Sequence, residues 1–135
     1  MGDLTGARLA CLDLVHAYNN HIDTGHADRV PDLFTDDSVL DVGFALTGID
    51  AIRAAMQARA ANTERRTTHV TANVQFTDVG DRTATTTSVL LLFVLDDDEP
   101  GAPTAIIRCE DDFVHSDDGG WRFQRRSLSV VSGKP

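Results

Sequence analysis

Polar and apolar residues alternate along residues 66–76, and this period of two predicts a β-strand. Val70, Ala72, Val74 and Phe76 share one side of such a strand, whereas His69, Thr71, Asn73 and Gln75 share the other. The polar side carries one histidine followed by small hydrogen-bonding groups, a composition that suits the wall of a pocket. A partly buried histidine satisfied by a neighbouring side chain gives the same pattern, and the strand by itself favours that simpler interpretation.

Before residue 66 the apolar residues follow a helical period. Leu9, Leu12, Val15, Tyr18 and Ile22 recur at steps of three and four. They predict a helix over residues 6–23, with Thr5 as its N-cap and Gly25 just beyond its end. The following segments predict a short helix over 27–34, a turn over 35–38, a short strand over 39–43 and a third helix over 49–61.

After residue 66 the period of two continues in four predicted strands, 68–78, 82–95, 104–115 and 121–131. Turns at 79–81 and 116–120 and a charged loop at 96–103 join them. The second strand would extend about 45 Å at ~3.4 Å per residue, so we expect a strongly curved sheet. Its end at residues 89–95 is apolar on both sides, so we expect both faces of the strand to be buried there.

Three helices followed by an antiparallel meander indicate an α+β fold, with the helices on one face of the sheet. The length of 135 residues fits one domain, 1–135. Three helices cannot cover a long curved sheet completely, so we expect a pocket between them. Phe44, Leu46, Met56 and the run 90–95 would make this pocket apolar.

The formal net charge of −9 argues against nucleic acid or an anionic membrane as a partner. No apolar run approaches the ~20 residues that cross a bilayer, and the first residues lack the apolar stretch of a secretory signal. We therefore expect a cytoplasmic protein. Cys11 and Cys109 have no metal-ligand spacing and are expected to be buried thiols in a reducing compartment.

Asp23 ends the first predicted helix, where the helix dipole disfavours a carboxylate by a few tenths of a kcal/mol. Either Asp23 takes part in ordinary turn chemistry, or it faces inward and holds the imidazole of a histidine; the sequence favours neither. Tyr18 lies on the apolar stripe of the same helix, about 140° around it from Asp23. On spacing alone, Tyr18 is a core aromatic residue.

Arg126 belongs to a strand that must be at least half buried, so it needs an anion. Asp111, Glu110 or a bound ligand could supply it, and the spacing favours an internal ion pair. The sequence contains no phosphate-binding glycine loop, no nucleophile elbow and no zinc-ligand spacing. What is left is general acid–base chemistry, or no catalysis.

Four segments together resemble the SnoaL-like proteins of the nuclear transport factor 2-like superfamily, from about Leu9 to Val131. They are YNNHIDTGHADRVPDLFTDDSVLDV, TGIDAIRAAM, THVTANVQF and DFVHSDDGGWRFQRR, in this order. The resemblance implies a cone-shaped, curved antiparallel sheet packed against three N-terminal helices. It also implies a homodimer formed through the sheet.

Within that superfamily the chain is most similar to the scytalone dehydratase-like lyases, which include a bile-acid dehydratase and a dehydrochlorinase. The resemblance implies that Asp23 and His69 are their Asp–His dyad. It also implies that Tyr18 and Arg126 are catalytic residues, with Arg125 replacing Arg126 if the last strand is bulged. The second histidine of scytalone dehydratase has no counterpart, because that region reads LLLFV, and Val42 or a neighbour replaces its first-strand tyrosine. The dehydratase's own substrate is therefore not expected.

The resemblance implies a lyase, dehydratase or isomerase that uses no cofactor and no metal. His69, held by Asp23, would remove a proton from carbon in a cyclic, mostly apolar small molecule. Tyr18 would donate a hydrogen bond, and Arg126 would stabilise negative charge at the pocket mouth. The alternatives are a non-catalytic module that binds a small ligand or a partner, and a polyketide cyclase.

Overall fold

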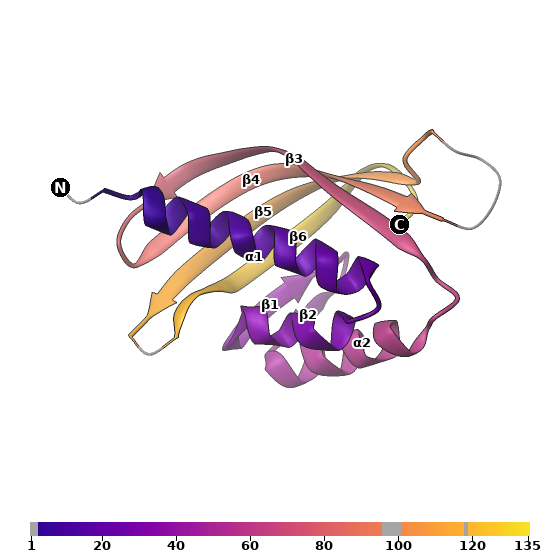
Figure 1. The fold of residues 1–135 in the computed structure, drawn as a ribbon, viewed down its shortest axis with the longest axis horizontal. Coiled ribbons are helices and arrows are strands. Elements are labelled where there is room, and N and C mark those ends of the chain that lie inside the picture. The colour runs from indigo at the N-terminus through magenta and orange to yellow at the C-terminus, as the bar shows by residue number, and fades with distance from the viewer. Residues whose placement is uncertain (1–2, 96–100, 118) are drawn as a thin grey trace.

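The computed structural model describes residues 3–95, 101–117 and 119–135. Its elements, in chain order, are α1 (Thr5–Asp23), the 3₁₀ helix η1 (Ala27–Leu33), β1 (Phe34–Asp41), β2 (Ala45–Thr47), α2 (Ile49–Ala61), β3 (Thr67–Val79), β4 (Thr83–Val94), β5 (Ala105–Ser116) and β6 (Gly120–Gly133). Figure 1 shows α1 lying across one face of the curved sheet, with η1 and α2 beside its C-terminal end.

The six strands form one sheet in the order β2-β1-β6-β5-β4-β3. The predicted meander β3–β6 and the α+β class are confirmed. The sheet is mostly antiparallel, as predicted, but β1 pairs with β6 in parallel. That pairing brings the segment between η1 and α2 onto the last strand, where it helps to enclose the space under the helices.

The residues at the helix ends agree with the sequence prediction in most places. α2 has the predicted bounds, and Gly25 follows the end of α1 with φ +85°, a conformation that glycine adopts without strain. Thr5 is the first residue of α1 rather than its N-cap; its backbone N–H donates to Asp3 Oδ1 at 2.9 Å. η1 is a 3₁₀ helix and contains Pro31.

Two short segments differ from the prediction. Residues 35–38 lie inside β1 instead of forming a turn, although the pairing of β1 with β6 shifts register between Phe34 and Val39. Ser38 Oγ donates to the Thr35 carbonyl within this irregular stretch, which explains its turn-like composition. The short strand β2 was not predicted. Of the predicted charged loop 96–103, residues 96–100 lie outside the described residues.

A β-bulge in β3 changes which residues share a face. Asn73 has φ 55°, and the pairing with β4 skips a residue between Ala72 and Gln75. As a result, Phe76 packs against the main core on the same side of the sheet as His69. The prediction that these two residues lie on opposite sides is wrong, because strict alternation stops at the bulge.

Two hydrophobic clusters fill the concave side of the sheet. The larger contains stacked aromatic rings, with Phe34 and Phe113 each 4.9 Å from the ring of Phe123. The smaller contains Leu90 and Leu92, whereas Leu91 between them is only partly buried. The apolar end of β4 is therefore fully buried on one face only, contrary to the prediction.

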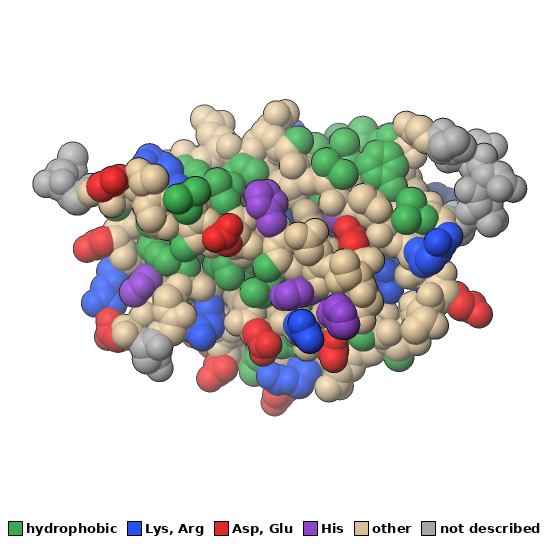
Figure 2. Space-filling view, viewed as in Figure 1, with side chains coloured by type: hydrophobic (Ala, Val, Ile, Leu, Met, Phe, Trp, Pro, Cys, Tyr) green, Lys and Arg blue, Asp and Glu red, His purple; other side chains and the backbone are tan. Residues whose placement is uncertain are grey.

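The surface mixes both signs of charge. Figure 2 shows acidic and basic side chains interspersed on the face that carries α1, with hydrophobic side chains gathered near the sheet end at which β4 leads toward β5. Among the residues that the structure describes, no helix is long and apolar enough to cross a membrane.

Candidate active site

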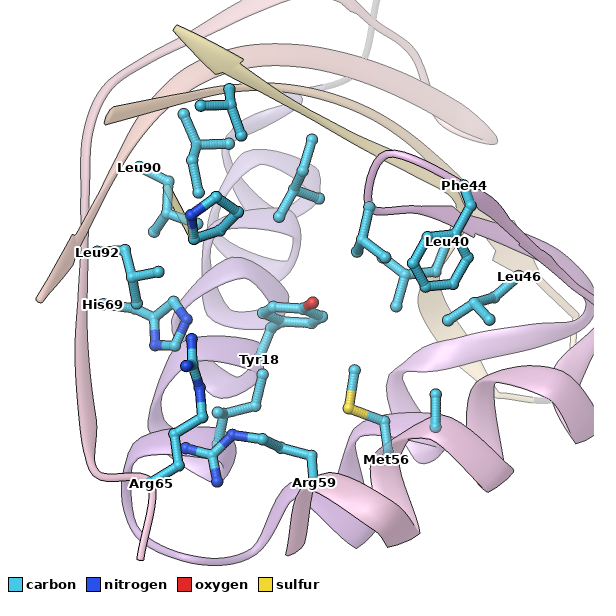
Figure 3. A pocket seen from close by; sticks show the side chains of 17 residues that line it. Tyr18, Leu40, Phe44, Leu46, Met56, Arg59, Arg65, His69, Leu90 and Leu92 are labelled. Atoms are coloured by element: carbon cyan, nitrogen blue, oxygen red, sulfur yellow. The ribbon is translucent and has the colours of Figure 1, made fainter. Parts of the chain in front are cut away.

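A cavity of about 330 Å³ lies between the helices and the concave side of the sheet. Most of its wall is apolar, with Ile22, Leu40, Leu46, Met56, Leu90 and Leu92 among the lining residues. Phe44, Leu46 and Met56 all line it, as the sequence predicts. Four polar side chains reach the same space: Tyr18, Arg59, Arg65 and His69 (Figure 3).

Asp23 and His69 meet at one end of this cavity. Asp23 is the last residue of α1, and His69 lies near the start of β3, so the packing of α1 against β3 joins them. His69 Nδ1 is 2.5 Å from Asp23 Oδ1, and the His69 backbone N–H donates to Oδ2 at 2.7 Å. Thr67 Oγ1 donates to Oδ1 at 2.9 Å. These hydrogen bonds offset the unfavourable position of a carboxylate at a helix C-terminus.

This geometry fixes the protonation pattern of His69. Because the Asp23 carboxylate accepts, His69 Nδ1 carries the hydrogen, and Nε2 is left with a lone pair on the cavity side. Burial lowers the pKa of His69 below its ordinary value, although the hydrogen bond and charge of Asp23 act in the opposite direction. The imidazole is therefore neutral at pH 7 and can accept a proton from a bound molecule.

Tyr18 lines the middle of the cavity. Figure 3 shows its hydroxyl directed into the open centre of the space that His69 and Met56 also border. Burial raises the pKa of Tyr18 to about 12, although the nearby positive charge of Arg126 opposes this. The hydroxyl therefore stays protonated at neutral pH, and it can donate a hydrogen bond to a ligand oxygen.

Arg126 lies beneath Tyr18, away from the cavity wall. Its side chain is fully buried, with Nε 3.5 Å from Asp111 Oδ1 and the guanidinium carbon 4.4 Å from the Tyr18 ring centre. The expectation that Arg126 sits at the pocket mouth is wrong; the internal ion pair with Asp111 is what the structure contains. Arg125 does not reach the cavity either, since its half-exposed side chain lies 3.7 Å from Asp41.

The arginines that do reach the cavity were not predicted. Arg59 comes from α2 and donates to Thr67 Oγ1 at 3.2 Å and to the Asn62 carbonyl at 3.3 Å. Arg65 comes from the segment between α2 and β3. In Figure 3 both side chains extend toward the His69 end of the cavity. The sequence carries no signal for them, because an arginine at a helix end is most often solvated.

The described residues contain no group of three histidine, cysteine or acidic side chains that could hold a metal ion. Cys11 and Cys109 are buried free thiols. Burial raises the pKa of Cys11 to about 12, so it is not a nucleophile at neutral pH. The residues that can do chemistry in the described part of the cavity are His69, Tyr18 and the two arginines.

The model of the SnoaL-like domain matches residues 5–127. An NTF2-like protein with a cystatin-like fold from Novosphingobium aromaticivorans is 25% identical, with a TM-score of 0.77, and the match covers 99% of this chain and 94% of the other. No curated protein matches the sequence.

Two further solved structures have lower identity and show the fold alone. A protein of unknown function with a cystatin-like fold from Nostoc punctiforme is 18% identical with a TM-score of 0.84, over 100% of this chain and 98% of the other. A proposed scytalone dehydratase from Novosphingobium aromaticivorans is 23% identical with a TM-score of 0.70, over 93% and 85% of the two chains.

Proposed function

We propose that this chain, which belongs to the SnoaL-like domain family, is a cofactor-independent lyase or isomerase that acts on a cyclic, mostly apolar small molecule. One observation carries the proposal: the neutral His69, held by Asp23 at 2.5 Å, presents its free nitrogen to a mostly apolar cavity. A carboxylate-oriented imidazole is the usual arrangement for a general base that acts near neutral pH.

The proposed reaction begins when His69 Nε2 removes a proton from a carbon next to a carbonyl group. The C–H electron pair moves into a new C=C bond, and the carbonyl oxygen becomes an enolate that accepts a hydrogen bond from Tyr18. In a lyase the enolate then expels a β-hydroxyl, which leaves as water after taking the proton from His69. In an isomerase His69 returns the proton to a different carbon.

Each group contributes in a different way. A positioned base accelerates proton transfer by roughly 10²- to 10⁴-fold, and a fixed donor at the developing anion adds about 10²-fold or more. Asp23 stabilises the imidazolium that forms. Arg126 is a positioning residue in this scheme, because its guanidinium supports the Tyr18 ring and does not line the cavity. No metal or cofactor is required, which remains a prediction.

The test uses 2-tetralone, a bicyclic apolar ketone with acidic α-protons, as the probe. Proton exchange in D₂O, followed by NMR, measures the base step without any leaving group. The wild-type protein is expected to accelerate exchange, and His69→Gln to lose most of that acceleration. His16→Gln is the matched control, because His16 lies exposed on α1. Equal exchange rates for wild type and His69→Gln would reject the proposal.

The apolar lining favours a second candidate: the chain binds a small apolar ligand without turning it over. His69 would then only orient the ligand, and its replacement by alanine would weaken binding modestly. A polyketide cyclase remains a variant of the first proposal, since ring closure also begins by removing a proton from carbon. A reaction that depends on His69 would decide against the carrier.

We also propose a homodimer formed through the outer face of the sheet. Val70, Leu91 and Ile106 lie in one row across β3, β4 and β5 on the side away from the cavity, and Val70 is 43% exposed. A second copy would cover this row. Light scattering should give the mass of a dimer for the wild type and of a monomer for Val70→Glu; a wild-type monomer at high concentration would remove this proposal.

A further inference from the structure

We propose that Arg59 and Arg65 form an anion-binding subsite beside His69, so that the ligand of this cavity is an apolar ring that carries a carboxylate. The inference rests on the proposed function in one respect: it takes the same cavity as the site. It adds the class of substrate, and it defines which end of the ligand meets His69.

The cavity has two unlike ends. Leu40, Leu46 and Met56 line one part, whereas Arg59 and Arg65 extend toward His69 (Figure 3). No aspartate or glutamate side chain lines the cavity among the described residues. A ring in the apolar part would therefore direct any acidic substituent toward the two guanidinium groups.

Neither Arg59 nor Arg65 forms an ion pair with a described side chain, although the charge of Asp23 raises the pKa of Arg59. Arg59 uses its donors on Thr67 and on the Asn62 carbonyl, both uncharged, and Arg65 forms no hydrogen bond or ion pair with any described residue. Asp23 lies close by, but its oxygens already accept hydrogen bonds from His69 and Thr67. A ligand anion would find free donors here.

The electrostatics point the same way. Burial, and then the like charge of Arg65, lower the pKa of Arg59, although the charge of Asp23 opposes this; an anion between the two guanidinium groups would stabilise both. The chain as a whole has a net charge of −9 and repels anions. Affinity for a carboxylate must therefore come from a local site, and a planar guanidinium fork matches a carboxylate well.

Such a subsite would also select the reacting carbon. A carboxylate held by Arg65 anchors one edge of the ring next to His69, while the apolar body extends toward Tyr18 and Met56. The carbon that reaches Nε2 is then one near the carboxylate. Fixed orientation of this kind is a large part of what an active site contributes to a rate.

The test compares two probes of nearly the same shape, 2-naphthoate and 2-naphthamide, by isothermal titration calorimetry at low salt. Wild type is expected to bind the carboxylate about tenfold or more tightly than the amide, because charge-assisted hydrogen bonds are roughly twice as strong as neutral ones. Arg65→Gln should bring the ratio close to one, and Arg65→Lys should restore part of it. Arg53→Gln is the control, since Arg53 lies exposed on α2 outside the cavity.

The subsite would be overturned if wild type bound naphthoate no more tightly than naphthamide, or did not bind naphthoate at all. It would also be overturned if Arg65→Gln left the ratio of the two affinities unchanged. Raising the salt concentration should lower the wild-type ratio. His69→Gln separates this inference from the proposed function, because it should abolish proton exchange and keep the carboxylate preference. A preference that survives while exchange never depends on His69 would sustain the subsite and reject the catalytic proposal.

Discussion

Two pairs of a carboxylate and a basic side chain lie on the concave side of this sheet, and they differ in burial, distance and charge. Asp23–His69 joins α1 to β3, is part-exposed at 15% and 12%, and is short at 2.5 Å. Asp111–Arg126 joins neighbouring positions of β5 and β6, is fully buried, and is longer at 3.5 Å. Only the first pair has a basic group that is neutral at pH 7 and lines the cavity.

These differences give the two pairs different roles: the first can take part in the reaction, and the second holds the structure around Tyr18. His69 can exchange a proton with a bound molecule because its neutral form is favoured and its Nε2 faces the ligand space. Arg126 keeps its charge, and its pair with Asp111 instead fixes the floor on which Tyr18 rests. An arginine that the family resemblance marks as catalytic can therefore act by positioning another residue, without touching the substrate.

The largest expected effect comes from replacing the base of the first pair. His69→Gln should reduce 2-tetralone proton exchange by about 10²- to 10⁴-fold, because the positioned base is lost. Its free energy of unfolding should change little by comparison, since the amide can still donate to Asp23. If His69→Gln kept the wild-type exchange rate, the Asp23–His69 pair would have only a structural role, like Asp111–Arg126.

Breaking the second pair should affect stability first. Asp111→Asn leaves Arg126 buried without a countercharge, which costs about 3–5 kcal/mol in the free energy of unfolding measured with urea. The matched control is Asp111→Leu combined with Arg126→Met, which removes both charges and should recover most of that loss. A single variant as stable as wild type would show that Asp111 does not compensate the buried arginine.

The same variant has a pH signature. Burial raises the pKa of Asp111 to about 6. Below that pH the wild-type carboxyl takes up a proton and becomes neutral, as the asparagine already is. Between this pKa and the ordinary carboxyl value of 3.8 the folded wild type binds a proton that its unfolded chain does not bind, so the stability of wild type relative to Asp111→Asn should be greater at pH 5 than at pH 7.5. A difference that does not change with pH would contradict the assignment of this titration to Asp111.

A smaller effect, a shift of the pH–rate profile, should test how Asp23 acts on His69. Exchange requires neutral His69, so the rate should fall as the pH drops through the pKa of His69, below its ordinary value. Because the hydrogen bond and charge of Asp23 raise that pKa, Asp23→Asn should move the acid limb of the pH–rate profile to lower pH. An acid limb that moves to higher pH would mean that the carboxylate does not act on His69.

The sequence predicted the parts of the site that follow from local periodicity. The helical stripe placed Asp23 at the end of α1, and the alternation after residue 66 put His69 on a strand that packs against it. The local signal for the bulge at Asn73 is weak: asparagine adopts a positive φ more readily than most residues, but the alternation around it fits a regular strand equally well. The strand faces beyond it were therefore predicted incorrectly.

Arg126 and Arg65 show the other limit. The strand pattern correctly predicted that Arg126 is buried and favoured an ion pair. It could not predict on which side of Tyr18 the guanidinium lies, because that depends on how β6 packs beneath α1. Arg65 belongs to no periodic element, so only the three-dimensional path from α2 to β3 brings it to the cavity. Long-range packing, which single-residue patterns do not contain, decides both positions.

The most direct test of the central claim is the tautomer of His69, observed by long-range ¹H–¹⁵N NMR correlation on the uniformly labelled protein, with His69→Gln identifying the signal. The Asp23 contact predicts hydrogen on Nδ1 and none on Nε2. Burial of the ring predicts that it is neutral at pH 7, with a titration midpoint below the ordinary histidine value of about 6.5. Hydrogen on Nε2 and a bare Nδ1 at pH 7, or a ring that is still protonated there, would contradict it.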